Sequence, residues 1–238
     1  MIITGASRGI GKAIAFYFGK KGWNIVINSG HIEDELLQTA RELEQNGISC
    51  LPVFGDVRDE TFIHNMVDKS VEKFGSIHCL INNAGISHIG LFTDMTLEQW
   101  NTILTTNLTS AFLCSRSVIP YMLREKQGSI INISSVWGQV GASCEVAYSA
   151  AKGGLNAFTK ALGKELAPSH ITVNAIACGM IDTRMNQCFS PKEIQDIVDD
   201  IPAGRMGTCD EVAKLAYNIS QAGDYLTGQI ITLDGGWV

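Results

Sequence analysis

The sequence of 238 residues predicts an α/β fold, in which a doubly wound parallel sheet of about seven strands carries helices on both faces. Two observations lead to this prediction. Short β-branched runs alternate with longer helical segments along the whole chain, and a glycine-rich turn joins the first run to the first helical segment. No linker and no internal repeat interrupts the alternation. We therefore expect residues 1–238 to form a single domain.

The expected strands are short runs rich in Ile, Val and Leu, as is typical of buried strands in a parallel sheet. They cover residues 2–4, 24–28, 49–54, 77–82, 129–134, 171–175 and 229–233. The first is only about three residues long, near the lower limit for a strand. Either the sheet accepts a short strand there, or the natural start of the chain lies further upstream.

The expected helices are segments in which apolar residues recur every three to four positions. They cover residues 10–21, 33–46, 61–73, 97–123, 148–167 and 210–221. Because each follows a predicted strand, each is expected to cross over one face of the sheet and lead into the next parallel strand.

Composition and charge exclude several classes of function. The net charge is −6 and no Lys/Arg cluster is longer than a pair, so the sequence lacks the basic surface that nucleic-acid binding requires. No apolar run reaches the roughly 18 residues that span a bilayer, and no charged leader precedes the first strand. We therefore expect a cytoplasmic protein.

The seven cysteines form no Cys-x-x-Cys pair and have no histidine at metal-binding spacing. We therefore expect no metal site and reduced thiols. Most of the cysteines should pack as small buried side chains, with Cys144 and Cys178 as the exceptions, since both lie near candidate site residues.

The turn at residues 5–11 has the glycine spacing of a dinucleotide-binding loop. Gly5 permits the tight turn, Gly9 lets the backbone approach a pyrophosphate, and Gly11 allows close helix–strand packing. The helix that follows presents free N–H groups to the anion. The position of this turn between a strand and a helix predicts a Rossmann-like dinucleotide site. The same loop contributes Ser7, Arg8 and Ile10.

The second strand ends at Asn28 without the acidic residue that would hold the ribose hydroxyls of NAD(H). Arg8 can pair with a 2′-phosphate through its planar guanidinium group, so the sequence favours NADP(H). The alternative is that Arg8 is a solvated loop charge and that Asn28 binds the ribose of NAD(H).

Two further turns lie at expected carboxyl ends of strands, where ligands bind in such folds. Asp56 and Val57 follow the third strand, and the Asp56 carboxylate can accept a hydrogen bond from an adenine amino group. A helix-capping role for Asp56 is the alternative. The turn 82–85, Asn-Asn-Ala-Gly, follows the fourth strand, and there the competing interpretation is an ordinary turn.

Tyr148 and Lys152 are four residues apart on a predicted helix, so they share one face. An ammonium group near the phenol is expected to lower its pKa from about 10 by charge attraction. With Ser135 upstream, these residues indicate a proton-donating site for carbonyl reduction. Tyr17 and Lys21 have the same spacing, so spacing alone does not identify the site.

Taken in order, the glycine turn, the turn 82–85, Asn107, Ser135 and the Tyr148/Lys152 pair resemble the short-chain dehydrogenase/reductase family over essentially the whole chain. Within that family the sequence is most similar to the β-ketoacyl-acyl-carrier-protein reductases. The motifs that carry this similarity lie at residues 4–11, 131–135 and 201–207.

The resemblance implies a role for each matching residue. Tyr148 would be the general acid and Ser135 would polarise the substrate carbonyl. Lys152 would hold the nicotinamide ribose, and Asn107 would order a water that leads protons toward Lys152. Tyr17 would be a packing residue. The resemblance also implies that the cofactor is bound by Asn83, Ala84, Gly85, Ile181 and Thr183, besides Tyr148 and Lys152.

The implied reaction is NADPH-dependent reduction of a 3-oxoacyl thioester to the 3-hydroxyacyl product, a step of fatty acid biosynthesis. One alternative is a dehydrogenase for another secondary alcohol or ketone, such as a sugar, a steroid or a small diol. A remote alternative is a protein that senses dinucleotides without turnover.

The resemblance also implies a homotetramer and an acyl carrier protein as a possible substrate carrier. Because such carriers are acidic, cations should surround the mouth of the site, and the sequence offers Arg124, Lys126 and Arg184. Ser169 and His170 stand before the sixth strand where a basic residue would help, so the expected cationic surface is incomplete. Substrate choice is expected to depend on a loop at residues 185–199.

Overall fold

The computed structural model describes residues 1–238 and contains a seven-stranded parallel sheet with the strand order β3-β2-β1-β4-β5-β6-β7. The strands are β1 (Ile2–Ile3), β2 (Ile25–Ser29), β3 (Cys50–Phe54), β4 (Cys79–Asn82), β5 (Gly128–Ser135), β6 (Ile171–Cys178) and β7 (Ile230–Leu233). The order reverses between β1 and β4, and in open α/β sheets ligands bind at the carboxyl ends of the strands beside such a switch point. The predicted fold class is confirmed.

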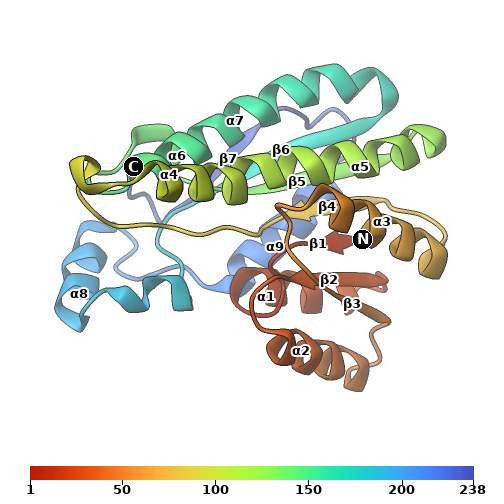
Figure 1. Cartoon of the computed structure of the whole chain (residues 1–238), viewed down its shortest axis with the longest axis horizontal. Coiled ribbons are helices and arrows are strands. Elements are labelled where there is room, and N and C mark those ends of the chain that lie inside the picture. Colours follow the sequence, from red (N-terminus) through yellow and green to blue (C-terminus); the bar gives the residue numbers. More distant parts are fainter.

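Helices cover both faces of this sheet (Figure 1). They are α1 (Gly9–Gly19), α2 (Glu33–Gln45), α3 (Glu60–Phe74), α4 (Leu97–Leu104), α5 (Ser110–Glu125), α6 (Trp137–Val140), α7 (Val146–Leu166), α8 (Pro191–Asp200) and α9 (Cys209–Ser220). Residues of α1, α2 and α9 enclose one apolar cluster against the sheet, and residues of α3 and α5 enclose the other. No helix combines the length and apolar character needed to cross a membrane.

Alternation along the strands divides the core between the two faces. Ile2 packs on the α3/α5 side and Ile3 on the α1/α9 side, and Leu80 and Ile81 of the adjacent β4 repeat this division. All four side chains are fully buried. The two-residue β1 is therefore held by burial and by pairing with β2 and β4, although it is one residue shorter than predicted.

The helix predicted over residues 97–123 is wrong as a continuous α-helix, because a π-helical segment at Thr105–Thr109 separates α4 from α5. Polar side chains bond to the backbone of the preceding turn here: Ser110 Oγ donates to Thr106 O at 2.6 Å, and Asn107 Nδ2 donates to Ile103 O at 2.9 Å. Such bonds compete with regular helical hydrogen bonding. The segment moves Asn107 inward, where it is 2% exposed.

Residues 185–199, predicted as a loop, contain a 3₁₀ turn (Arg184–Cys188) and most of α8. Ser190 begins α8 with a capping box in which Ser190 Oγ accepts from Glu193 N and Glu193 Oε2 accepts from Ser190 N. Pro191 occupies the first helical position, which suits its fixed φ. The Ser-Pro-x-Glu pattern is thus the signal that the sequence-based prediction missed.

A buried chain of hydrogen bonds crosses from β4 to α7. Asn82 Nδ2 donates to Asn132 Oδ1 at 2.8 Å, and Asn132 Nδ2 donates to Thr159 Oγ1 at 2.8 Å. Asn82 and Asn132 are register partners in β4 and β5. This chain connects two strands to the helix that carries Tyr148 and Lys152.

Candidate active site

A cavity of about 600 Å³ opens at the carboxyl edge of the sheet, beside the switch point between β1 and β4. Its walls are the glycine turn, the ends of β2, β4, β5 and β6, the first turns of α7, and the segment after β6. All the residues predicted to bind cofactor line it except Gly11, and of the predicted catalytic residues only Asn107 does not. The sheet topology therefore assembles the predicted site from segments that are far apart in the chain.

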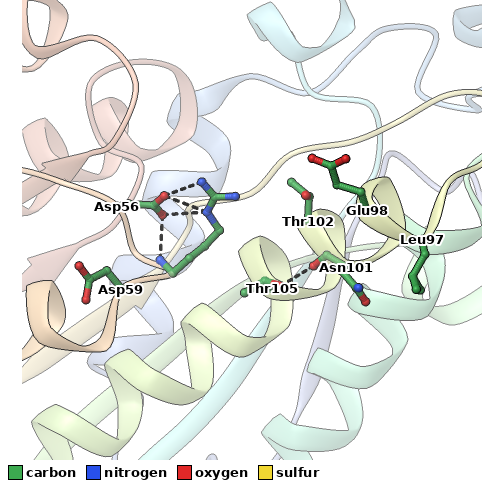
Figure 2. Close-up of a pocket in the computed structure, with 8 residues that line it drawn as sticks. Asp56, Asp59, Leu97, Glu98, Asn101, Thr102 and Thr105 are labelled. Atoms are coloured by element: carbon green, nitrogen blue, oxygen red, sulfur yellow. Dashed lines mark hydrogen bonds and ion pairs between the residues drawn. The ribbon is translucent and has the colours of Figure 1, made fainter.

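A second hollow adjoins this cavity but carries none of the predicted catalytic residues. It lies between the loop after β3 and helix α4, with Asp56 and Asp59 on one side and Glu98 and Thr102 on the other (Figure 2). It is wide open at the surface, only one of its 8 lining residues is hydrophobic, and it shares only Asp56, Arg58 and Thr102 with the first cavity. We place the active site in the first cavity, which is lined by 31 residues and is called the large cavity below.

The glycine turn is held in place mainly by the end of β4. Asn83 Nδ2 donates to Thr4 O at 2.9 Å and to Gly5 O at 2.8 Å. Thr4 Oγ1 accepts from Asn83 N and Ala84 N, both at 3.0 Å. Asn83 therefore braces the turn with its side chain, a contact that its predicted role in cofactor binding did not include.

Two glycines of the turn require conformations or space that other residues lack. Gly9 has a φ of +55°, and a Cβ atom there would meet only Thr183 within 4 Å, at 3.8 Å, so the backbone is open toward the cavity. A Cβ atom on Gly11 would lie 2.6 Å from Gly5 O, which explains the glycine at this position although it does not line the cavity.

The adenosine end of the cavity contains an unused hydrogen-bond acceptor. Asn28 Nδ2 donates to Val53 O and Gly55 O, whereas the buried Asn28 Oδ1 has no partner. Buried polar atoms are usually paired, and Asn28 lines the cavity, so its orphaned acceptor suits a donor from a ligand. A ribose hydroxyl or an adenine amino group supplies such a donor, and this observation fits a dinucleotide.

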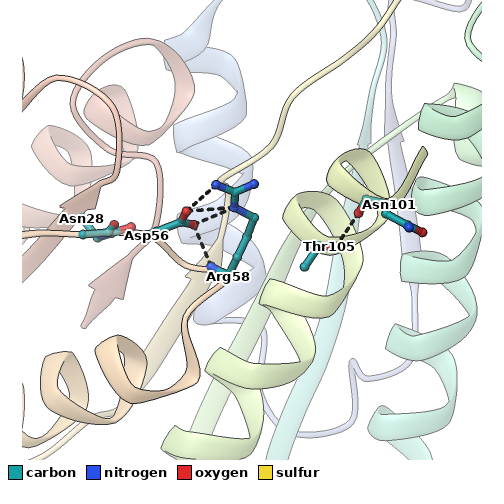
Figure 3. A network of polar contacts seen from close by, with 6 residues as sticks. Asn28, Asp56, Arg58, Asn101 and Thr105 are labelled. Atoms are coloured by element: carbon teal, nitrogen blue, oxygen red, sulfur yellow. Dashed lines mark hydrogen bonds and ion pairs between the residues drawn. The ribbon is translucent and has the colours of Figure 1, made fainter. Parts of the chain in front are cut away.

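Asp56 lies beside Asn28 and is bound by Arg58 (Figure 3). Arg58 donates to the Asp56 carboxylate from its backbone N at 2.9 Å, from Nε at 2.8 Å and from Nη2 at 2.6 Å. These hydrogen bonds hold the pKa of Asp56 below its usual value, so the carboxylate stays ionised. Asp59, not Asp56, caps α3, since its side chain accepts from Thr61 N and Phe62 N.

Tyr148 and Lys152 lie one turn apart on α7 and face the end of β5. Lys152 is 4% exposed, its Nζ donates to Ile133 O at 2.8 Å, and it lies 5.5 Å from the centroid of the Tyr148 ring. Ser135, the last residue of β5, accepts a hydrogen bond from Trp137 N through its Oγ at 3.2 Å. The three side chains thus converge in the cavity from two adjacent elements.

Burial dominates the ionisation of this group. It raises the pKa of Tyr148, the neighbouring ionisable side chains of Cys178 and Glu145 raise it further, and a hydrogen bond with Ser135 opposes the shift. Burial also lowers the pKa of Lys152 to about 8. The expected lowering of the Tyr148 pKa by Lys152 is therefore wrong for this structure, because burial raises that pKa and the Lys152 ammonium donates to Ile133 O.

Asn107 lies behind the cavity wall, close to Lys152. Its Oδ1 accepts from Ile86 N at 3.2 Å and its Nδ2 donates to Ile86 O at 2.8 Å. Gly85 separates the two side chains: a Cβ atom at this position would lie 2.5 Å from Asn107 Oδ1 and 3.6 Å from Lys152 Nζ. The amide side chain of Asn107 therefore holds the loop after β4 against the catalytic group.

The second Tyr/Lys pair lies outside the cavity. Tyr17 packs against Tyr217 of α9, with 5.5 Å between ring centroids, and Lys21 lies 6.0 Å from the Tyr17 ring. Tyr17 is thus a packing residue, as predicted.

Ser134 also lines the cavity, but its Oγ donates to Asn156 Oδ1 at 2.7 Å and so makes a structural contact.

The cysteines follow the prediction in part. Four are buried, namely Cys50, Cys79, Cys114 and Cys178, whereas Cys188 is exposed and all seven are free thiols. Cys178 lines the cavity at the end of β6, where burial raises the pKa of its thiol to about 12. A thiol of that kind is inert at neutral pH.

Two residues near the site were not predicted from the sequence. Glu145 begins α7 three residues before Tyr148, and its charge acts on the phenol. Glu35 binds the loop residue Arg8, with 2.7 Å between Glu35 Oε2 and Arg8 Nη1. The position of Glu145 next to Tyr148 in sequence was a usable signal, but no local pattern indicates the partner of Arg8.

A Rossmann-like sheet with a glycine turn at its switch point defines a dinucleotide-binding protein, and the comparisons specify which kind. The family model described as short chain dehydrogenase matches residues 1–194. The chain belongs to the short-chain dehydrogenase/reductase family, so it is an oxidoreductase of a family that binds NAD(P).

Similar proteins match over nearly the full length. The 3-oxoacyl-[acyl-carrier-protein] reductase FabG of Thermotoga maritima is 38% identical over 239 residues, covering 100% of this chain and 96% of that protein. The uncharacterized oxidoreductase YmfI of Bacillus subtilis is 37% identical, covering 99% and 97%. A crystal structure from Agrobacterium tumefaciens, provisionally assigned as a gluconate dehydrogenase, has a TM-score of 0.95 and 33% identity and covers 99% of this chain and 94% of its own.

Proposed function

We propose that residues 1–238 act as one dinucleotide-binding and catalytic domain that reduces a 3-oxoacyl thioester with NADPH. The observation that carries the reaction type is the convergence of Ser135, Tyr148 and Lys152 in a cavity that also contains the glycine turn. The substrate class draws its support from the similarity to reductases named for 3-oxoacyl-[acyl-carrier-protein].

In this proposal the bound nicotinamide supplies the hydride that reaches the substrate carbonyl carbon. Tyr148 donates its phenolic proton to the carbonyl oxygen, and its raised pKa keeps the phenol protonated at neutral pH, as an acid for reduction must be. Ser135 Oγ donates a hydrogen bond to the same oxygen. Lys152 holds the nicotinamide ribose, and Asn107 orders a water that leads protons toward Lys152.

Two of the cations expected near an acyl carrier lie far from the cavity. Arg124 and Lys126 lie at the end of α5 and lead into the amino end of β5, whereas Ser135 stands at the carboxyl end. Eight residues of strand, roughly 25 Å, separate the two ends. The expectation of cations at the mouth of the cavity is therefore wrong for Arg124 and Lys126, whereas Arg184 lines the cavity.

We also propose that the chain forms a homotetramer. Large apolar side chains are exposed on α4, on α5 and at the start of α7, namely Leu97 at 74%, Phe112 at 42% and Val146 at 40%, and association of copies would cover them.

A substrate panel tests the function. We expect NADPH consumption with 3-oxoacyl thioesters of coenzyme A and, faster, with the carrier-bound form, whose advantage in kcat/KM should fall with added salt because exposed charges are screened over about 8 to 10 Å. The gluconate dehydrogenase likeness supports a second candidate, oxidation of a sugar acid. No turnover of either thioester, together with turnover of gluconate or another alcohol, would establish that candidate, and no turnover of any substrate would favour a sensor.

Replacement of Arg8 tests the proposed preference for NADPH. Arg8→Ala should weaken NADPH binding about 3- to 30-fold while changing NADH binding little. A charge-assisted hydrogen bond contributes about 1.5 to 3 kcal/mol, and loss of the exposed pair with Glu35 subtracts up to about 1 kcal/mol. Dissociation constants from nucleotide fluorescence measure both effects. Equal losses for the two cofactors would assign Arg8 to the pyrophosphate or to no ligand.

A further inference from the structure

Glu35, in the first turn of α2, joins the glycine turn to the segment after β6. Its Oε2 accepts from Arg8 Nη1 and its Oε1 accepts from Arg184 Nη1, each at 2.7 Å. Arg8 is 27 residues and Arg184 is 149 residues from Glu35 in sequence, and both arginines line the large cavity, whereas Glu35 does not. One carboxylate therefore binds two guanidinium groups at the adenosine side of the cavity.

Every arginine that lines the large cavity already has a carboxylate partner. Arg8 and Arg184 share Glu35, and Arg58 is bound to Asp56. A 2′-phosphate that enters this end of the cavity finds no unpaired guanidinium group. It must displace a carboxylate or share an arginine with one.

The surroundings of Glu35 add negative charge. Glu33 and Asp34 occupy the same first turn of α2 and are exposed, and the N-cap residue Ile32 offers no polar side chain. Hydrogen bonds from Arg184 and Arg8 hold the pKa of Glu35 below its usual value, so it is ionised at neutral pH. The ionised Glu35 carboxylate, whose Oε2 lies 2.7 Å from Arg8 Nη1, therefore repels a dianionic phosphate near Arg8.

We propose that Glu35 is a specificity-determining residue that competes with the cofactor's 2′-phosphate for Arg8 and thereby narrows the preference for NADPH over NADH. Arg184 holds the second carboxylate oxygen, so Glu35 does not simply swing away when the phosphate arrives. NADH carries no 2′-phosphate and leaves the Arg8–Glu35–Arg184 bridge intact. The inference rests on the proposed function only in taking the large cavity as the dinucleotide site.

The test measures binding of NADPH and NADH to the substrate-free protein by nucleotide fluorescence. Glu35→Gln should tighten NADPH binding about 3- to 10-fold, the range expected when an exposed ion pair and a neighbouring like charge are removed, and should leave NADH within about 2-fold. The matched control is Glu42→Gln, which removes the same charge from the same helix, where Glu42 pairs with Lys12 at 2.7 Å. It should change neither constant.

A second variant shows whether the effect passes through Arg8. Arg8→Ala should weaken NADPH binding more in the Glu35→Gln protein than in the wild type, because only there is the guanidinium group free for the phosphate. Unchanged or weaker NADPH binding in Glu35→Gln, in a protein whose melting temperature matches the wild type, would overturn the proposal. Wild-type protein that binds neither nucleotide would instead refute the dinucleotide site itself, and the proposal with it.

Discussion

Tyr148→Phe is expected to reduce turnover by about 100- to 10,000-fold while the fold and nucleotide binding stay nearly unchanged. The substitution removes one hydroxyl group and keeps the ring, which packs beside Ile103 and Ala147. Because the proposed reaction requires a proton at the carbonyl oxygen, loss of that hydroxyl acts on kcat and not on the affinity for NADPH. Steady-state kinetics and nucleotide fluorescence on the same preparation separate the two quantities.

Tyr17→Phe is the matched control, since Tyr17 has a lysine at the same spacing but packs against Tyr217 outside the cavity. It should retain nearly full activity. Retention of more than a tenth of the wild-type rate by Tyr148→Phe would remove Tyr148 from the role of general acid.

Lys152→Met should lower activity at least 100-fold and at the same time raise the stability of the nucleotide-free protein at pH 7. Methionine keeps the length of the side chain but removes a buried ammonium group, whose burial depresses the pKa from 10.5 to about 8. A shift of that size corresponds to roughly 3 kcal/mol, from which the unpaired Ile133 carbonyl subtracts about 1 to 3 kcal/mol. A gain of about 1 kcal/mol corresponds to about 2 to 4 °C in melting temperature.

The pH dependence gives this prediction a second measurement. The folded protein binds the Lys152 proton less tightly than the unfolded chain, so the Lys152 contribution to the wild-type free energy of unfolding should rise with pH between about 8 and 10.5. Below pH 8 the cost of the buried ammonium is fully present. Lys152→Met should therefore lose its advantage as the pH rises through this window. Lys160→Met, an exposed position on α7, is the control, and identical pH profiles for the wild type and Lys152→Met would contradict the argument.

The predictable part of the site consists of residues whose relations are local. Tyr148 and Lys152 share a helix face because of their spacing, and Ser135 ends a strand whose apolar pattern is visible in the sequence. The fold class was predictable from the same kind of local pattern, since segments with the apolar spacing of strands alternate with segments with the apolar spacing of helices. These relations depend on one element at a time, and tertiary contacts did not alter them.

The unpredicted part depends on contacts between distant segments. Nothing in the glycine turn indicates that Arg8 faces Glu35, because the helix α2 that carries Glu35 is placed by packing on the sheet. The interruption at Thr105–Thr109 also escaped prediction, since polar side chains that bond to the preceding turn leave the apolar spacing unchanged. The pKa of Tyr148 was misjudged because burial depends on the whole cavity wall and not on the nearest lysine.

The hydrogen bonds from Asn82 through Asn132 to Thr159 favour one alignment of β4 and β5 over others. An all-apolar parallel sheet offers many nearly equivalent alignments, since one isoleucine replaces another at modest cost. A slip of β5 by two residues against β4 would break the Asn82–Asn132 hydrogen bond, and each buried polar group left without a partner costs about 1 to 3 kcal/mol. The alignment that pairs Asn82 with Asn132 also places Asn132 against Thr159 of α7, so the helix that carries Tyr148 and Lys152 is fixed to the same register that sets Ser135.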